Sequence, residues 1–327
     1  MPFLPVNIYK PELFHGRRMR GSFFEGWFYK IADHGGRNII AIIPALFIDK
    51  NRAERHASIQ FSRKGASRAL VQIYPQQQFL HSPHTLSFRI GNNRFRSDGL
   101  DLDLATDEGA VRGQLTFTGL KPWPVKWTSP GAMGWFAFVP FMQCYHGVLS
   151  MDHAVTGTLR IDGQDIDFTG GRGYIEKDWG TAFPSVYIWM QCNHFGLSGT
   201  SVMASVANIP WLGGSFRGFI IGLLYRDRLL RFATYTGAKL LSMEVDDQRV
   251  ELASEDTSYR IELHAERTKG VLLHGPDGDR FRRGFHETLS SRIHLRLSRR
   301  SRAGLETIFE SAGEPAGLDV NGRLQQL

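Results

Sequence analysis

The alternation of apolar and polar residues along much of the chain is the feature that most limits its fold. A period of two places successive side chains on opposite faces of a β-strand, whereas an amphipathic helix repeats every 3.6 residues. The alternation runs through residues 97–104, 111–118, 156–161 and 292–297, and residues 38–48 form a continuous apolar run. Arg226-Asp227-Arg228 separates two further apolar runs, as a hairpin turn would. Helical periodicity of useful length is missing, so the sequence predicts an all-β protein.

The charge balance narrows the classes of partner. The chain has 39 basic and 32 acidic residues, a formal net charge of +7, which nucleic acid or an anionic lipid surface would each explain. The arginines are scattered apart from the pairs Arg17-Arg18, Arg282-Arg283 and Arg299-Arg300. No recognition helix, zinc spacing or RNA-binding signature accompanies them, so nucleic acid is not expected as a partner.

The cysteines and the apolar runs bear on the compartment. Cys144 and Cys192 are too few and too far apart for a disulfide framework or a zinc site. The first residues lack the basic leader and long apolar core of a signal peptide. No apolar run approaches the about 18 residues at which a spanning helix is suspected. We therefore expect a cytoplasmic protein with reduced thiols, with peripheral contact to a membrane as an open alternative.

Residues 119–154 interrupt the alternation. Four prolines separate a set of aromatic residues, namely Trp123, Trp127, Trp135, Phe136, Phe138 and Phe141. A segment of this length is usually functional or disordered, and this one is too apolar for disorder. Two interpretations remain open: the segment fills a core between two halves of the protein, or it is a lid or access gate pressed against lipid.

Residues 173–193 concentrate the groups best suited to chemistry. On a strand, Tyr174, Glu176 and Asp178 share one face, and Ile175, Lys177 and Trp179 share the other. The same rule places Tyr187, Trp189, Gln191 and Asn193 on one face. Rings mixed with a few hydrogen-bonding groups suit a pocket for an aromatic or polyene-like ligand. The alternative is a sheet corner whose polar groups satisfy turns.

Glu25 is the best single candidate for an acid. In an extended segment it shares a face with Phe23, Trp27 and Tyr29, and burial among rings raises the pKa of a carboxyl. Such a group can stay protonated near neutral pH and donate its proton. The alternative is a structural ion pair with Lys30 or an arginine.

Glu176 and Asp178 form a second carboxylate candidate. Their side chains lie roughly 6–7 Å apart along one face of a strand, where they can raise each other's pKa or share an arginine. An ion-pair network at the end of a barrel is the alternative. His146, Asp152 and His153 lie in the aromatic-rich segment, but no His-x-His or His-x-x-x-His spacing occurs there, so no metal is expected. No Gly-x-Ser-x-Gly elbow or phosphate-binding loop indicates other chemistry.

Three blocks together resemble the tocopherol cyclase family. Residues 173–193 carry Glu-Lys-Asp-Trp-Gly, then Phe-Pro, then Trp-Met-Gln-Cys-Asn, similar to the family signature. Residues 23–30, Phe-Phe-Glu-Gly-Trp-Phe-Tyr-Lys, resemble a second family motif, and residues 133–153 resemble the bacterial branch. Asp178 replaces the Asn of the plant proteins, and Phe28-Tyr29 reverses their Tyr-Phe.

The resemblance implies two lipocalin-like β-barrel or sandwich domains, at residues 1–165 and 166–327. It also implies cofactor-free, acid-catalysed cyclisation of a prenylated hydroquinone to a chromanol, or a related proton addition to the alkene of a terpenoid. Glu25 or Glu176 would supply the proton, with Asp178 as a relay. The expected substrate-binding residues are Trp27, Tyr29, His146, His153, Tyr174, Trp179, Trp189, Gln191 and Asn193.

Within this set, Trp27 and Trp189 would flank the developing cation, and Gln191 and Asn193 would hold the phenol oxygens. The main alternative is a carrier or sensor that holds a prenyl quinone or terpenoid without changing it. A basic scaffold at a membrane surface is the third.

Overall fold

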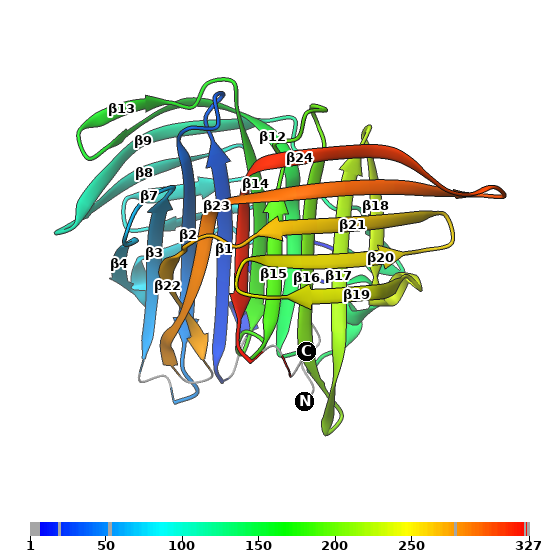
Figure 1. Cartoon of the computed structure of the whole chain (residues 1–327). Coiled ribbons are helices and arrows are strands. Elements are labelled where there is room, and N and C mark those ends of the chain that lie inside the picture. Colours follow the sequence, from blue (N-terminus) through cyan, green and yellow to red (C-terminus); the bar gives the residue numbers. More distant parts are fainter. Residues whose placement is uncertain (1–6, 19–20, 52–53, 278–279, 324, 326–327) are drawn as a thin grey trace. The chain divides into compact units, whose positions relative to one another are not determined.

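The protein folds almost wholly into antiparallel β-structure, which confirms the all-β prediction (Figure 1). The structure is a computed structural model that describes residues 7–18, 21–51, 54–277, 280–323 and 325. In this part of the chain, loops and four short 3₁₀ helices join twenty-four strands, and no α-helix occurs.

The strands divide between two compact units. The first comprises Met1–Phe183 and Val271–Phe285, and the second comprises Pro184–Gly270 and His286–Leu327. From the sequence, a domain change is expected near residue 165. The contacts put the passage between the units after Phe183, because the strand at Gly171–Gly180 pairs within the sheet of the first unit.

The first unit is built on a twelve-stranded sheet whose main path runs β4-β3-β2-β1-β14-β12-β9-β8-β7-β6-β5, with β13 beside β12. These strands are β1 (Phe23–Ala32), β2 (Ile39–Ile48), β3 (Arg55–Arg63), β4 (Leu70–Pro75), β5 (Phe79–His81), β6 (Ser87–Ile90), β7 (Asn93–Arg96), β8 (Gly99–Thr106), β9 (Gly109–Thr118), β12 (Cys144–Ile161), β13 (Gln164–Asp167) and β14 (Gly171–Gly180).

This sheet folds over its own core without closing. β3 contacts β6 and β4 contacts β8, but among the described strands the outermost two, β4 and β5, do not pair with each other. The lipocalin-like sandwich therefore fits the unit, and a closed barrel does not. Almost every residue of β2 is buried, which explains its uninterrupted apolar sequence: both of its faces lie against protein.

β22 (Val271–Asp277) returns to the first unit from the later part of the chain. Leu273 is buried in a small apolar cluster with Ala69 and Val271. The side chain of Gln60 accepts the backbone N–H of His274 at 2.9 Å and donates to its carbonyl at 2.7 Å. These two bonds fix the returning segment against β3.

The second unit is built on nine strands of a ten-stranded sheet, in the order β18-β17-β16-β15-β24-β23-β21-β20-β19. The tenth strand, β22, pairs with β23 and belongs to the first unit, as do the residues of β23 up to Phe285. Its strands are β15 (Tyr187–Cys192), β16 (Ser201–Trp211), β17 (Gly214–Tyr225), β18 (Arg228–Ala233), β19 (Lys239–Val245), β20 (Arg249–Glu255), β21 (Tyr259–Glu266), β23 (Arg280–Ser301) and β24 (Gly304–Asn321). Arg226 and Asp227 both have positive φ, as a two-residue hairpin turn between β17 and β18 requires, which confirms the predicted hairpin.

The aromatic segment, expected from the sequence at residues 119–154, ends at residue 143. It contains the strand pair β10 (Val125–Lys126) and β11 (Ser129–Pro130) and the 3₁₀ helix η3 (Gly134–Phe138), and β12 already begins at Cys144. Register shifts between Val148 and His153 interrupt the pairing of β12 with β14. These irregularities hide the strand from a search for strict alternation. The remaining 3₁₀ helices are η1 (Gly16–Arg18), η2 (Gln76–Gln78) and η4 (Thr234–Thr236).

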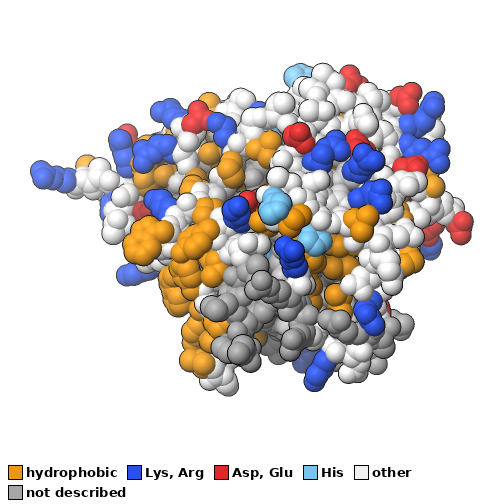
Figure 2. Space-filling view, turned by 180° about the vertical axis from the view of Figure 1, so that it is seen from behind, with side chains coloured by type: hydrophobic (Ala, Val, Ile, Leu, Met, Phe, Trp, Pro, Cys, Tyr) orange, Lys and Arg blue, Asp and Glu red, His pale blue; other side chains and the backbone are white. Residues whose placement is uncertain are grey.

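Figure 2 shows Lys and Arg side chains dispersed over the visible face, whereas apolar side chains gather on one side of it. Among the described residues, no helix has the length and apolar character needed to cross a membrane.

Candidate functional site

Three neighbouring strands carry most of the predicted site residues. β14 lies between β1 and β12, and directly opposite residues of antiparallel strands project from the same face. Glu25 lies opposite Trp179, and His146 lies opposite Asp178. We call the face that carries Glu25 and Trp179 the inner face, because it packs into the core of the first unit, and the other the outer face. The register confirms the alternation predicted for residues 174–179.

The two predicted proton donors therefore lie on opposite faces of one sheet. Glu25 belongs to the inner face, while Glu176, opposite Phe28, belongs to the outer face together with Asp178. The thickness of the sheet separates them. They cannot serve the same reacting atom, so each face has to be considered by itself.

On the inner face, Glu25 forms an ion pair with Lys177. The Lys177 ammonium also donates to the carbonyl of Leu13 at 2.7 Å and lies 3.1 Å from His15 Nδ1. The second carboxylate oxygen of Glu25 accepts the backbone N–H of His15 at 2.8 Å. Neither charged side chain is exposed to solvent.

This pairing contradicts the expectation that Glu25 stays protonated. Burial alone would raise the pKa of Glu25, but the Lys177 charge and the hydrogen bonds from His15 and Lys177 outweigh it and lower the pKa below 4.5. Glu25 is therefore a carboxylate at neutral pH. The ion-pair interpretation of this residue holds, but the partner is Lys177 and not Lys30 or an arginine. The sequence pointed Lys177 away from Glu176 and Asp178, and nothing in it paired Lys177 with Glu25.

Aromatic rings enclose the Lys177–Glu25 pair. The Lys177 ammonium lies 5.1 Å from the ring centre of Trp27 and 4.9 Å from that of Trp179. The His15 ring stacks on Trp179 with centroids 4.2 Å apart, and Tyr145 stacks at 5.6 Å. The rings thus stabilise the Lys177 ammonium by cation–π contacts. The sequence analysis expected such contacts with the developing cation of the substrate.

Trp27 and Tyr29 are part of the hydrophobic core. Trp27 stacks on Phe88 at 4.1 Å, and burial raises the pKa of the fully buried Tyr29. Neither Trp27 Nε1 nor Tyr29 Oη has a hydrogen-bond partner within the described residues. The interior position of both side chains favours packing over the substrate-binding role predicted for them.

On the outer face, four side chains form a cluster of two hydrogen-bonded pairs joined by an ion-pair contact. The Tyr174 hydroxyl donates to Glu176, and His146 Nδ1 lies 3.0 Å from a carboxylate oxygen of Asp178. His146 Nε2 lies 3.6 Å from Glu176 Oε2, so the imidazole bridges the two carboxylates. We call Tyr174, Glu176, His146 and Asp178 the outer-face cluster. The Cys144 thiol lies 3.8 Å from Asp178 at its edge.

The cluster holds a proton on His146. Burial opposes the charged imidazolium, but Asp178 and Glu176 outweigh it and raise the pKa of His146 from 6.5 to about 9. Burial, together with the neighbouring carboxylates, raises the pKa of Tyr174 and of Cys144, so both stay neutral. At neutral pH the cluster therefore stores one dissociable proton between two carboxylates, at a largely buried position.

The same residues are the described group best placed to hold a metal ion. Ligand atoms of His146, Glu176 and Asp178 all lie within 4.8 Å of one another. Spacing along the chain could not reveal this group, because it forms across the register of β12 and β14. A cation would have to displace the proton of His146 against its raised pKa. Acid–base chemistry would need no such displacement.

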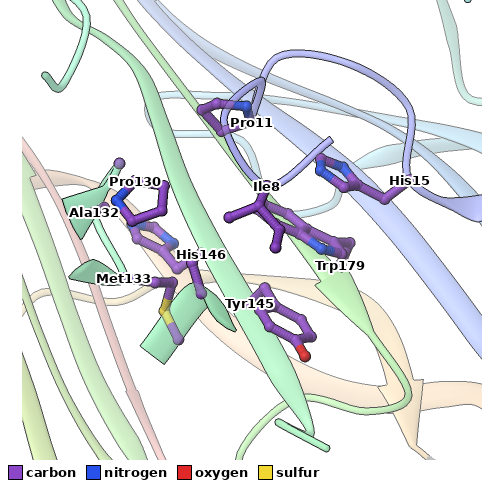
Figure 3. Close-up of a pocket in the computed structure, with 11 residues that line it drawn as sticks. Ile8, Pro11, His15, Pro130, Ala132, Met133, Tyr145, His146 and Trp179 are labelled. Atoms are coloured by element: carbon purple, nitrogen blue, oxygen red, sulfur yellow. The ribbon is translucent and has the colours of Figure 1, made fainter. Parts of the chain in front are cut away.

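A small pocket adjoins His146 (Figure 3). One part of its lining comes from Ile8, Pro11, His15, Tyr145, His146 and Trp179, and the aromatic segment lines the rest. That second wall consists of Pro130, Gly131, Ala132, Met133 and Ala137. The sequence analysis gave residues 119–154 as a core filler or as a lid or access gate, and His15 carried no signal in its local sequence. The walls are mostly apolar, with two histidines as polar groups.

His153 lies apart from the cluster, although it is on the same strand. Its Nδ1 is 3.1 Å from Ser150 Oγ, and its ring packs on Phe117 at 4.6 Å. Burial lowers the pKa of His153 to about 3, so it is neutral. It does not line the pocket beside His146. The substrate-binding role expected for it has no support in this geometry.

Trp189, Gln191 and Asn193 belong to the second unit. Trp189 and Gln191 project from one face of β15, as predicted, and Asn193 follows the end of that strand. All three side chains are buried. Gly317 on β24 leaves room for the Trp189 ring, since a Cβ there would lie 2.9 Å from it.

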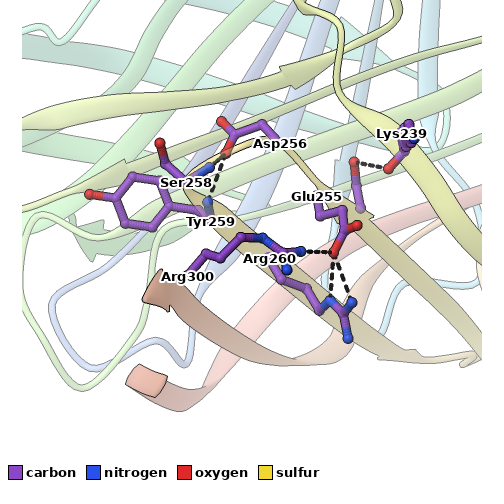
Figure 4. Close-up of polar contacts among 8 residues, drawn as sticks. Lys239, Glu255, Asp256, Ser258, Tyr259, Arg260 and Arg300 are labelled. Carbon is purple, nitrogen blue, oxygen red and sulfur yellow. Dashed lines mark hydrogen bonds and ion pairs between the residues drawn. The ribbon is translucent and has the colours of Figure 1, made fainter. Parts of the chain in front are cut away.

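The described arginine pair of the second unit is engaged locally. Arg299 bonds Glu306 at 2.9 Å, and Arg300 bonds Glu255 at 2.7 Å (Figure 4). Glu255 also accepts from Arg260, which ties β20 to β21. These arginines are therefore less available to an anionic partner. The side chains of Arg18, Arg282 and Arg283 lie outside the described residues.

Comparisons of the sequence with known proteins find tocopherol cyclases. The family model described as tocopherol cyclase-like matches residues 106–322. The probable chloroplastic tocopherol cyclase of Oryza sativa subsp. japonica is 28% identical over 149 residues, which cover 44% of this chain and 31% of the rice protein. The chloroplastic tocopherol cyclase of Zea mays is 25% identical over 198 residues, which cover 58% of this chain and 41% of the maize protein. This chain thus matches less than half the length of either plant protein.

Solved structures share the fold at low identity. CghA with Sch210972 superposes with a TM-score of 0.61 at 11% identity, covering 98% of this chain and 95% of that one. Kievitone hydratase from Nectria haematococca superposes with a TM-score of 0.52 at 13% identity, covering 98% of this chain and 99% of that one. At such identities the similarity supports the architecture alone.

Proposed function

Because the chain belongs to the tocopherol cyclase-like family, we propose that it is an enzyme that adds a proton to the alkene of a hydrophobic isoprenoid substrate. The specific form of the proposal is closure of a prenylated hydroquinone to a chromanol, with a terpenoid as the alternative substrate. The observation that carries it is the outer-face cluster, in which His146 holds a proton between Glu176 and Asp178.

Each member of the cluster has a role in this proposal. The His146 imidazolium passes its proton to the Glu176 carboxylate 3.6 Å away, and Glu176 delivers that proton to the alkene. Asp178 holds His146 through Nδ1 and keeps it charged. The Tyr174 hydroxyl fixes the orientation of Glu176. General acid catalysis is favoured when the donor group contacts the group that supplies its proton and both are shielded from bulk water.

The reaction balances without an added reagent. A C–H bond forms at the less substituted alkene carbon as the π bond breaks, and the phenol oxygen bonds to the tertiary carbon. The phenol proton returns to the cluster, so no net proton or electron is consumed. Glu25 takes no part, because its charge is neutralised by Lys177. The roles of Trp189, Gln191 and Asn193 remain predictions from the sequence resemblance.

The test is a cyclisation assay with methyl-phytyl-benzoquinol, kept anaerobic, in deuterated buffer and analysed by mass spectrometry. The expected product is a chromanol with one deuterium on the carbon next to the new ether carbon. Glu176→Gln should lower turnover by about two orders of magnitude or more, and His146→Gln should also lower it. His153→Gln is the matched control, a buried histidine of the same strand outside the cluster, and should retain activity.

Two results would contradict the proposal. Full turnover in both Glu176→Gln and His146→Gln would remove the cluster from the chemistry. Recovery of unchanged quinol in a stoichiometric complex with the wild-type protein would favour the carrier, the main alternative.

A further inference from the structure

Large apolar side chains are exposed together around the aromatic segment of the first unit. Trp127 is 80% exposed, and Phe141 is 56% exposed. Val125, Trp135 and Phe138 in the same segment are also exposed, as is Tyr9 near the start of the chain. We call these six residues the aromatic patch. Single exposed apolar residues are ordinary, but a gathered set of this kind marks an interaction surface.

The patch is held in place by its own contacts. The Tyr9 hydroxyl donates to the carbonyl of Trp127 at 3.0 Å, and its ring packs edge-on against Phe138 at 6.1 Å. Trp135 and Phe138 lie three residues apart on η3, where side chains at that spacing project from the same side. The patch is thus a defined surface of the folded unit.

The segment behind the patch also forms a wall of the pocket beside His146. Pro130, Met133 and Ala137 line the pocket. Trp135 and Phe138, both on η3, are exposed instead. Figure 3 shows Pro130, Ala132 and Met133 grouped beside His146. One short segment therefore has one side suited to apolar surroundings and another side that lines a small pocket.

Charge around the patch selects the partner. Residues 119–143 contain Lys121 and Lys126 and no Asp or Glu. In the stretch that follows Tyr9, Lys10 and Arg17 are exposed, and Glu12 is partly buried. Trp and Tyr are enriched where protein meets the boundary between headgroups and acyl chains, and Lys is attracted to anionic headgroups. This combination favours an anionic bilayer over a second copy of this basic chain.

We propose that the aromatic patch docks onto the surface of an anionic phospholipid bilayer, with Trp127 inserted among the headgroups. This docking stands independently of the proposed chemistry, because it rests on the exposed side of the segment. It places the wall of the small pocket next to a lipid phase.

The test measures partitioning of the full chain onto vesicles of phosphatidylcholine, with and without phosphatidylglycerol. Trp127→Asn should weaken binding to the anionic vesicles by about tenfold or more, since most of a tryptophan surface is removed. Leu212→Asn is the matched control, because Leu212 is equally exposed, at 80%, in the second unit. It should bind as the wild type does. Lys126→Glu should weaken binding by about tenfold on anionic vesicles and little on neutral ones.

Equal binding of Trp127→Asn and Leu212→Asn would overturn the proposal, and so would absence of wild-type binding. Quenching of Trp127 by brominated lipid, taken as the difference between wild type and Trp127→Phe, should confirm its depth. Dimerisation in solution that Trp127→Asn abolishes, without vesicle binding, would assign the patch to a second copy instead.

Discussion

Replacing Lys177 by methionine should leave Glu25 as an uncompensated charge in the core of the first unit. Methionine keeps most of the volume that packs against Trp27 and Trp179, so the change isolates the charge. Removing one partner of a buried pair costs about 3–5 kcal/mol. The carbonyl of Leu13 also loses its donor. For a unit of this size the loss corresponds to a fall in Tm of roughly 6–20 °C.

The pH dependence gives this prediction a specific signature. In the wild type the pKa of Glu25 lies below its ordinary value, so its contribution to stability is present above about pH 4.5 and lost as pH falls. Without Lys177, burial raises that pKa instead. The deficit of Lys177→Met relative to wild type should therefore shrink as the solution is acidified, because Glu25 becomes neutral.

Urea denaturation at pH 5 and pH 8 measures both effects. Arg112→Met is the matched control, since Arg112 bonds Asp103 at 2.9 Å on the surface of the same unit and should contribute less than about 1 kcal/mol. Adding Glu25→Met to Lys177→Met should recover at least about 2 kcal/mol. The reasoning is refuted if Lys177→Met is as harmless as the control, or if the double variant is no more stable than the single one.

Two further predictions concern β12 and its partner strand. Because the pKa of His146 is raised from 6.5 to about 9, its stabilising contribution is complete below pH 6.5 and is lost as pH rises through 9. Denaturation at pH 6 and pH 10 should show a loss of up to about 3 kcal/mol in the wild type that is absent in His146→Gln. Gly173→Ala should destabilise the protein by about 1–3 kcal/mol, because its Cβ would lie 2.1 Å from His153 Nε2. The same substitution made in His153→Ala should cost clearly less, and an equal cost would contradict the clash.

Strand character and the face of each side chain were predictable from local sequence. The alternation of residues 174–179 depends only on the two-residue period of a strand, and the register bears it out. The hairpin at Arg226-Asp227 was visible because polar turn residues separate two apolar runs. In the first part of β12, register shifts between Val148 and His153 disturb the period, and strict alternation is lost there.

The composition of each charged cluster was not predictable, because it depends on strands that are distant in sequence. Glu25 and Lys177 meet only through the pairing of β1 with β14, and His15 joins them from the segment before β1. His146 meets Glu176 and Asp178 only through the pairing of β12 with β14. Ring-rich surroundings correctly marked Glu25 as buried. The surrounding rings did not reveal Lys177, whose buried charge keeps Glu25 ionised.

The alternation Glu176-Lys177-Asp178 gives one strand two electrostatic functions. Lys177 projects to the inner face and neutralises Glu25, while its neighbours project to the outer face and meet His146. A slip of β14 by one residue would exchange the faces, placing two carboxylates on the inner face beside Glu25 and removing Lys177 from it. The Lys177–Glu25 pair is satisfied in only one register, and that register aligns Asp178 with His146. A structural ion pair on one side of the sheet thus specifies the geometry of the proposed acid on the other.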